Sequence, residues 1–121
     1  MNVGMQTNAG EEQQRFESGA TRSKMDVRYD LIPSAALRRL ARRYAVGADI
    51  HGDHNWKNGI PASAMVNHLL AHVDHFRDLL EKLQRGEAVD WSQEDDDLAA
   101  IAWGAFGLMW FQERLPEVLA K

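Results

Sequence analysis

Three histidines lie close together in the middle of the chain, at a spacing that suits ligand binding. His72 follows His68 by four residues, and His75 follows three residues later. In a helix the three side chains would fall within about 60° of each other. Imidazole groups spaced in this way can bind a metal ion or a phosphate. The alternative is that they lie at the edge of a helical core and hydrogen-bond to the backbone or to water.

A run of four acidic residues, 94–97, is the second candidate. Glu94 and Asp97 stand at positions i and i+3, an arrangement by which one helix offers two carboxylates to a magnesium ion that bridges phosphates. We therefore expect Glu94, Asp96 and Asp97 as candidate ligands of Mg²⁺, the one cofactor that the sequence suggests. Acidic residues also favour the first turn of a helix because of its dipole, so a structural role stays open.

The third candidate is the polar, glycine-rich segment 47–61, which we expect to form a structured loop. Asn55 and the glycine amides supply hydrogen-bond donors, Lys57 supplies a cation, and Trp56 offers a flat surface on which a base can stack. In the alternative, Trp56 and Ile60 fill the base of a helical bundle and Asn55 bonds within the turn. Upstream, Arg22, Arg28 and Tyr29 add possible contacts to phosphate and base.

Composition limits the kind of protein that positions these residues. A chain of 121 residues supports one core, and the absence of cysteine excludes disulfides, thiolate metal sites and a cysteine nucleophile. A formal charge of -4 argues against a protein whose whole surface binds nucleic acid, and a local basic patch stays open. The apolar stretch 98–111 is shorter than the roughly 20 residues of a membrane span, and no signal peptide is evident. We expect a soluble, cytoplasmic protein without a membrane partner.

Hydrophobic periodicity predicts an all-α fold, a compact bundle of three or four helices. Residues 1–26 are too poor in apolar side chains to offset the entropy of ordering and are expected to form a flexible arm. Residues 27–121 are expected to form a single helical domain, with helices at about 33–47, 63–85 and 93–114. No strand is predicted, apart from a short extended segment near 27–31.

Finer features of the helices follow from their caps and faces. Gly47 is expected to end the first helix, Ser63 to cap the second, and Ser92 with Asp95 to form a capping box for the third. The second helix should bury one broad face: Met65, Val66, Leu69, Val73, Phe76, Leu80 and Leu83. The third helix is apolar nearly all round, so it lies centrally or between subunits, and a homo-oligomer is expected.

Several segments of the chain match the pattern of one protein family. They are Gly19-Ala-Thr-Arg22, Arg28-Tyr-Asp-Leu-Ile-Pro33, Tyr44-Ala45-x-Gly47-Ala48, His51-Gly-Asp-x-Asn-Trp-x-x-Gly59, His72, and the stretch from Asp96 to Trp103. With these segments the chain resembles the phage and prophage proteins of the dATP/dGTP diphosphohydrolase N-terminal domain family, over roughly residues 19–112. The resemblance implies a protein of a phage-infected or lysogenic bacterial host that acts on or binds purine nucleotides.

The resemblance also implies a set of site residues. It carries over Arg22, Arg28, Asp30, Asp53, Asn55, Trp56, Lys57 and His72 as candidates for ligand contact. Together with the histidines, we expect the loop around Asp53 and the helix edge at His68, His72 and His75 to converge on one site for nucleotide phosphate. The expected partner is a purine nucleotide or a small molecule derived from one.

Three functions fit these expectations. The first is binding of a purine nucleotide, to sequester or sense it, without efficient turnover, because the loop supplies donors, cations and an aromatic ring but the sequence offers no convincing catalytic base. The second is a magnesium-dependent dATP/dGTP diphosphohydrolase that releases pyrophosphate, with Glu94, Asp96 and Asp97 holding the ion. The third is a non-enzymatic module for protein–protein interaction.

Overall fold

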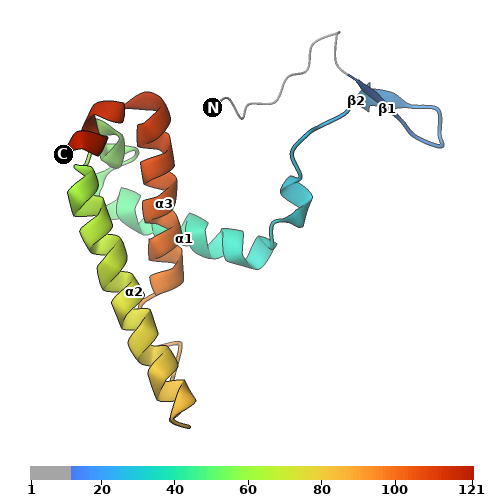
Figure 1. Cartoon of the computed structure of the whole chain (residues 1–121). Helices are drawn as coiled ribbons and strands as arrows, with labels where there is room; N and C mark the ends of the chain where they lie inside the picture. The colour runs from blue at the N-terminus through green and yellow to red at the C-terminus, as the bar shows by residue number, and fades with distance from the viewer. Residues whose placement is uncertain (1–11) are drawn as a thin grey trace. The chain divides into compact units, whose positions relative to one another are not determined.

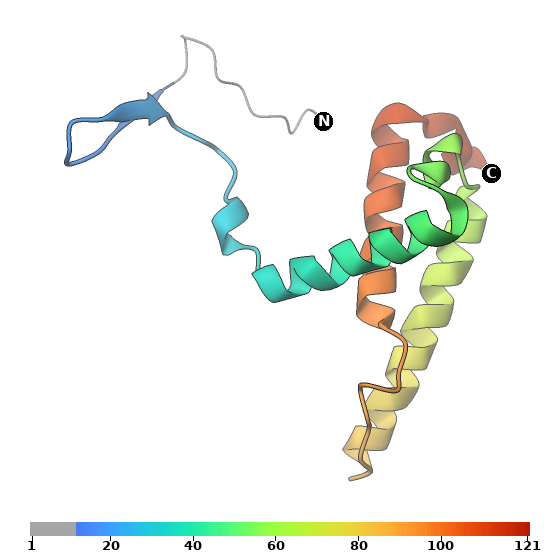
Figure 2. The same ribbon diagram turned by 180° about the vertical axis from the view of Figure 1, so that it is seen from behind.

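The computed structural model describes residues 12–121, which form two compact units (Figures 1 and 2). The first unit extends to Pro33, and the second runs from Ser34 to Lys121. The division therefore falls seven residues later than the one expected after residue 26.

The described part of the first unit contains a small hairpin where no strand was predicted. Strand β1 (Gln13–Arg15) pairs antiparallel with β2 (Thr21–Ser23), with Gln14 opposite Arg22. The connecting turn is closed by hydrogen bonds between Phe16 and both Gly19 and Ala20. A single turn of 3-10 helix, η1 (Tyr29–Leu31), takes the place of the extended segment expected near 27–31. The flexibility expected of the arm stays a prediction, and its first eleven residues lie outside the described part.

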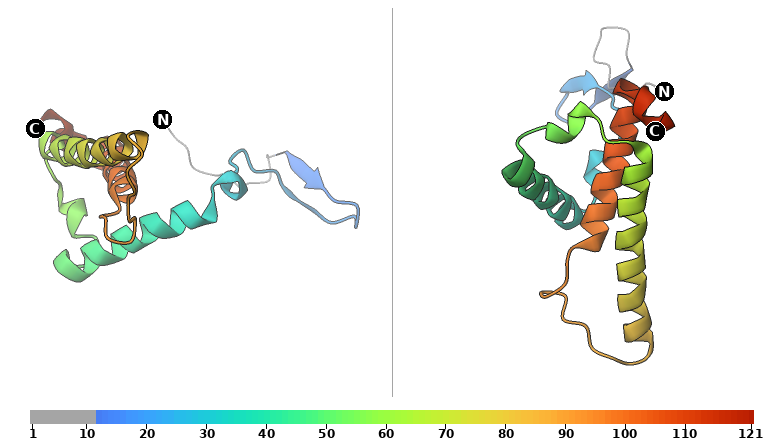
Figure 3. Two further views of the ribbon diagram at one scale, coloured as in Figure 1. Left: turned by 90° about the horizontal axis from the view of Figure 1, so that it is seen from below. Right: turned by 90° about the vertical axis from the view of Figure 1, so that its left-hand side faces the viewer.

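The second unit is a bundle of three helices, as predicted. It contains α1 (Ser34–His51), the 3-10 turn η2 (Asn55–Asn58), α2 (Ala62–Gln84), α3 (Asp97–Arg114) and the 3-10 segment η3 (Pro116–Ala120). Figure 3 shows α3 between α1 on one side and α2 on the other, with α2 and α3 antiparallel. The expectation that the apolar last helix lies centrally is therefore confirmed.

The core sits where α3 meets α2 and η3. Met65 of α2, Phe111 of α3 and Val118 of η3 are buried against one another. At Gly104 a Cβ atom would lie only 2.5 Å from Leu69 Cδ2, and at Gly107 it would lie 2.9 Å from Met65 Cε. Glycine at these two positions lets the backbone of α3 approach the side chains of α2, which explains why two poor helix formers occur inside a buried helix.

Two of the expected helix ends and the expected caps are wrong. Helix α1 continues through Gly47 to His51, because a glycine is tolerated inside a helix at a cost of about 1 kcal/mol. Ser63 does not cap α2; its N–H instead donates to the carbonyl of Lys121. Helix α3 begins at Asp97, and its cap is Asp96, whose carboxylate accepts from Ala99 N–H, whereas Ser92 bonds Asp90.

The buried face of α2 is narrower than predicted. Of the predicted residues, Met65 is buried and Leu69 and Phe76 are half-buried, whereas Leu79, which was not predicted, is also buried. The rest of that face is exposed: Val66, Val73, Leu80 and Leu83. A single neighbouring helix covers only one side of α2, so the flank of its apolar stripe remains on the surface.

Among residues 12–121, no helix combines the length and apolar character needed to cross a bilayer.

Candidate functional site

The segment that joins α1 to α2 is a tight turn that directs Trp56 into the bundle. Gly52 and His54 have positive φ angles of 94° and 59°, and this reverses the chain directly after α1. Glycine adopts such angles without strain, and the η2 turn then begins at Asn55. The prediction of a structured loop is thus confirmed, although the loop is shorter than segment 47–61.

Trp56 packs among aromatic rings from α1 and α3. Its ring centroid lies 6.3 Å from that of Tyr44, 6.4 Å from Trp103, 5.2 Å from Trp110 and 5.9 Å from Phe111. Most of these pairs meet edge to face, which aromatic rings favour. Trp56 and Ile60 also pack against the core, and Asn58 donates to Asn55 within η2. These contacts match the alternative in which Trp56 and Ile60 fill the base of the bundle and Asn55 bonds within the turn.

Three of these rings also form the wall of a cavity of about 500 Å³. Tyr44, Trp56 and Trp103 line it together with the last turns of α1 and the turn at 52–55. Its polar lining includes His51 at the end of α1 and Asp53, His54 and Asn55 of the turn that follows. Burial raises the pKa of the Tyr44 phenol, which therefore keeps its proton in neutral solution. Flat apolar walls beside a few polar groups are typical of a site for a heterocyclic ring.

Lys57 does not line this cavity. Its Nζ atom lies over the rings of Trp56 and Trp110, 5.7 Å and 5.4 Å from their centroids. Cation–π contacts of this kind stabilise the outer side of the aromatic cluster. The lysine is therefore used in holding η2 against α3.

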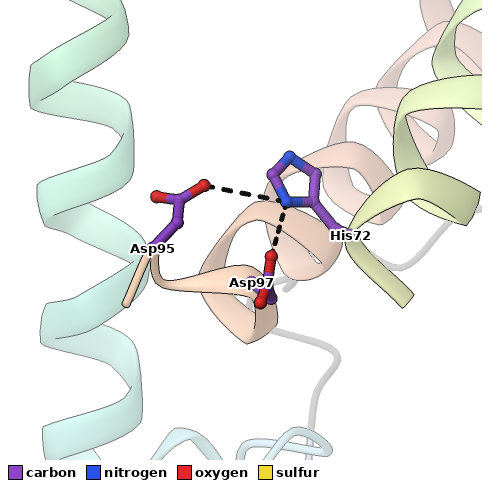
Figure 4. Close-up of side chains that lie close together, drawn as sticks. All are labelled: His72, Asp95 and Asp97. Atoms are coloured by element: carbon purple, nitrogen blue, oxygen red, sulfur yellow. Dashed lines mark hydrogen bonds and ion pairs between the residues drawn. The ribbon is translucent and has the colours of Figure 1, made fainter. Parts of the chain in front are cut away.

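A second group of residues lies at the start of α3, where α2 supplies two histidines. His72 Nδ1 lies 2.9 Å from Asp97 Oδ1, and His75 Nδ1 lies 2.5 Å from Asp97 Oδ2 (Figure 4 shows His72 and Asp97). Asp97 is only 3% exposed. His75 Nε2 also faces Glu94 at 3.3 Å. The hydrogen bond to Asp97 raises the pKa of His75, because the protonated ring is the better donor.

Two arginines of α1 bind the neighbouring acids. Both oxygens of Asp96 accept from Arg39, at 2.9 Å and 2.6 Å, and Asp95 Oδ1 lies 3.2 Å from Arg43 Nη1. The paired guanidinium group lowers the pKa of Asp96, and the carboxylate in turn raises the pKa of Arg39. The segment before α3 therefore joins α1 and α2 through charge. We call the residues Arg39, Arg43, His72, His75 and Glu94 to Asp97 the ionic cluster.

The structure separates the two surfaces that were expected to converge. None of the three predicted histidines lines the aromatic cavity. Trp103 lies six residues after Asp97 on α3, about 9 Å along the helix axis. His72 and His75 belong to the ionic cluster, whereas His68 is exposed and forms no side-chain hydrogen bond or ion pair within the described part of the chain. The histidines and the loop therefore do not line one cavity, and a site shared by them stays a prediction.

The predicted magnesium ligands also meet different partners. Asp97 faces the two histidines, Asp96 faces Arg39, and Glu94 faces His75. The structure instead brings His72, Asp95 and Asp97 together, with one ligand atom of each within 4.8 Å of the others.

The upstream candidates belong to the first unit. Arg22 pairs with Gln14 across the hairpin, and Arg28 forms two hydrogen bonds to the carboxylate of Asp30. Arg28 lowers the pKa of Asp30 through these bonds. Tyr29 is exposed.

Sequence reasoning missed Tyr44, Trp103 and Asp95. Tyr44 and Trp103 were named within the family segments but not as ligand contacts, yet each lies on the helix face that turns toward Trp56. A search for aromatic residues on the faces nearest the loop would have found them. Asp95 was assigned to a helix cap, and no sequence signal distinguishes it from the acids on either side.

The comparisons with known proteins agree with the resemblance noted from the sequence. The family model described as dATP/dGTP diphosphohydrolase, N-terminal, matches residues 16–120. No curated protein and no solved structure matches the chain. Because the family match covers most of the sequence, including both the aromatic cavity and the ionic cluster, this chain belongs to the dATP/dGTP diphosphohydrolase N-terminal family.

Proposed function

We propose that this protein binds a purine nucleotide, with the base inserted into the aromatic cavity. The observation that carries the proposal is the cavity of about 500 Å³ walled by Tyr44, Trp56 and Trp103. Rings of this kind stack on nucleobases, at about 1–3 kcal/mol for each base. The family to which the chain belongs is described by its action on dATP and dGTP, which agrees with a purine ligand.

Polar groups at the turn would bind the sugar and the first phosphate. The backbone amides of Asp53 and His54 donate to no protein acceptor within residues 12–121. His51, His54 and Asn55 also line the cavity. Backbone amides in a turn with positive φ angles are a common anion-binding arrangement. Asp53 would accept a hydrogen bond from the base or the sugar.

Binding without efficient turnover is supported by the state of the acidic residues. Each carboxylate of the run 94–97 already faces a histidine or an arginine. None of these acids lines the aromatic cavity. In this proposal the protein sequesters or senses a nucleotide in the cytoplasm of a phage-infected or lysogenic bacterium.

The test is to fill the cavity without harming the fold. Gly47 lines the cavity, and a Cβ atom at this position would meet nothing within 4 Å. Gly47→Leu should therefore be accommodated within α1, and it should gain about 1 kcal/mol of helix propensity. We expect at least tenfold weaker binding of dATP and dGTP by titration calorimetry, with an unchanged or raised melting temperature.

Ala41→Leu is the matched control, because Ala41 is exposed on the same helix and does not line the cavity. This variant should bind as the wild type does. Equal affinity of the wild type and Gly47→Leu, or no binding by either, would contradict the proposal.

A magnesium-dependent diphosphohydrolase is the second candidate. It is favoured by the activity named in the family description, and its ion would lie among the carboxylates of residues 94–97. Release of pyrophosphate from dATP or dGTP in the presence of Mg²⁺ would select it over simple binding. That release should then be lost in Asp97→Asn.

The interaction module is supported by the exposed apolar side chains of α2. Absence of any thermal shift across a panel of nucleotides would favour it, since a ligand at 100 times its dissociation constant should stabilise the fold by about 2.7 kcal/mol.

A further inference from the structure

Three potential ligand atoms face one another at the start of α3. His72 Nδ1 lies 2.9 Å from Asp97 Oδ1 and 3.8 Å from Asp95 Oδ2. Figure 4 shows the imidazole of α2 directed toward both carboxylates. Two atoms bound to one metal ion at about 2.1 Å, and about 90° apart, lie about 3 Å from each other. The first separation fits this requirement already. The second, and that of the two carboxylate oxygens, which lie within 4.8 Å of each other, require the Asp95 side chain to move closer.

Each carboxylate is oriented by a contact to its other oxygen. Asp95 Oδ1 lies 3.2 Å from Arg43 and accepts from the N–H of Asp96, while Asp97 Oδ2 faces His75. Asp95 Oδ2 and Asp97 Oδ1 are thereby directed toward His72. Partners of this kind around a metal site fix the ligands in place and tune their basicity.

The local charge favours a cation. Four carboxylates, 94–97, are accompanied by the guanidinium groups of Arg39 and Arg43. Asp95 and Asp97 also line a second cavity, of about 410 Å³, which His72 does not line. A divalent cation would balance the remaining negative charge when the histidines are neutral.

We propose that His72, Asp95 and Asp97 form a binding site for a divalent transition-metal ion, of the class of Zn²⁺, Mn²⁺ or Co²⁺. An imidazole ligand favours these ions over Mg²⁺, which prefers oxygen ligands alone. Three protein ligands leave coordination positions for water or a substrate. The site lies apart from the aromatic cavity, so this inference does not rest on the proposed nucleotide.

The experiment uses the full chain without an affinity tag, after treatment with a chelator. Calorimetric titration with Zn²⁺, Mn²⁺, Co²⁺ and Mg²⁺ should show one transition-metal ion bound for each chain, with Mg²⁺ at least tenfold weaker. The visible absorption of bound Co²⁺ gives an independent signal that the ion has left its octahedral hydration shell for a protein site. His72→Ala and Asp95→Asn should each weaken binding at least tenfold.

His68→Ala is the matched control, because His68 lies one turn before His72 on α2 and outside the ionic cluster. We expect it to bind metal as the wild type does. Asp95 is exposed, so Asp95→Asn tests the site without removing a buried group.

Three results would overturn the proposal. One is absence of transition-metal binding, and another is Mg²⁺ binding as tightly as Zn²⁺ and Mn²⁺. The third is equal loss in His68→Ala and His72→Ala with no effect of Asp95→Asn, which would place the ion between two histidines on the surface of α2.

Discussion

The two ends of α3 are held in the bundle by different kinds of contact. Toward its C-terminus, Trp103, Trp110 and Phe111 pack against Trp56 and the core. At its N-terminus, Asp97 and the preceding acids bind arginines of α1 and histidines of α2. Near neutral pH, apolar packing depends on shape and little on pH or ions, whereas charge pairs depend on both. One helix therefore combines a stable end with a responsive end.

The largest expected effect lies at the aromatic end. Phe111 is fully buried, so Phe111→Ala should lower the free energy of unfolding by about 3–5 kcal/mol, measured by urea denaturation. Phe106→Ala is the control, because Phe106 is 46% exposed on the same helix. Its effect should be below about 1 kcal/mol. Equal losses in the two variants would show that burial does not distinguish these sites.

The next effect lies at the ionic end. Asp97→Asn should cost about 1–3 kcal/mol, because a buried acceptor for two histidines becomes an amide. Asp74→Asn breaks an exposed pair with Arg77 and should change stability by less than about 0.5 kcal/mol. Thermal melts of both variants test the contrast. A loss no larger for Asp97 than for Asp74 would contradict it.

Acid should weaken the ionic end selectively. Arg39 lowers the pKa of Asp96 in the folded state, so the pair adds stability above about pH 4, and this stability is lost as the pH falls through the lowered pKa. Asp96→Asn removes the charge and keeps a residue that can cap α3. The melting temperature of this variant should lie below that of the wild type near neutral pH and converge with it in acid. A constant difference would speak against the mechanism.

Alkali should weaken the aromatic end. Burial raises the pKa of Tyr44, so above about pH 10 the unfolded chain loses the phenolic proton before the folded chain does. The ordinary pKa of a tyrosine phenol is 10.0. The stability of the wild type relative to Tyr44→Phe should therefore fall as the pH rises beyond this value. Melting curves of the two proteins in alkaline buffers measure this. A parallel decline in both would assign the effect to other groups.

The smallest effect on folding is expected on the outer side of α2, where a homo-oligomer would form if the chain self-associates. Leu70 is 61% exposed beside Val66 and Val73. Leu70→Lys should leave the unfolding free energy within about 0.5 kcal/mol, and it should lower the mass measured by sedimentation if this surface joins two copies. Gln84→Lys, at the exposed end of the same helix, should not change the mass.

The helices could be predicted from the sequence because their periodicity reflects burial. The apolar character of residues 98–111 predicted a last helix either at the centre of the bundle or between subunits, and the structure has it at the centre. The helix boundaries were harder to predict. Glycine is typical of a helix end, but Gly47 lies within α1, because the cost of about 1 kcal/mol of a glycine inside a helix is small beside the gain from tertiary packing. The cap at Asp96 was missed because four consecutive acids offer several equivalent caps.

The two candidate sites differ in how far the sequence reveals them. His72 and Asp97 were both identified, since their residue types carry chemistry wherever they lie. Their partner Asp95 was not identified, because the conformation of the segment that joins α2 to α3 determines which acidic side chain faces α2. The cavity depends on the angle at which α1 crosses α3, so Tyr44 and Trp103 could be joined to Trp56 only in three dimensions.

The close approach at Gly104 has a consequence for mutational surveys of this protein. A methyl group there would press on Leu69, which lies three residues before His72, while Asp97 lies two helical turns before the glycine. A substitution that pushes α2 from α3 would therefore also separate the imidazole from its carboxylate. A screen for loss of metal binding should therefore recover variants of Gly104, although this residue offers no ligand atom. Their loss of binding would be caused by a wider separation of α2 from α3.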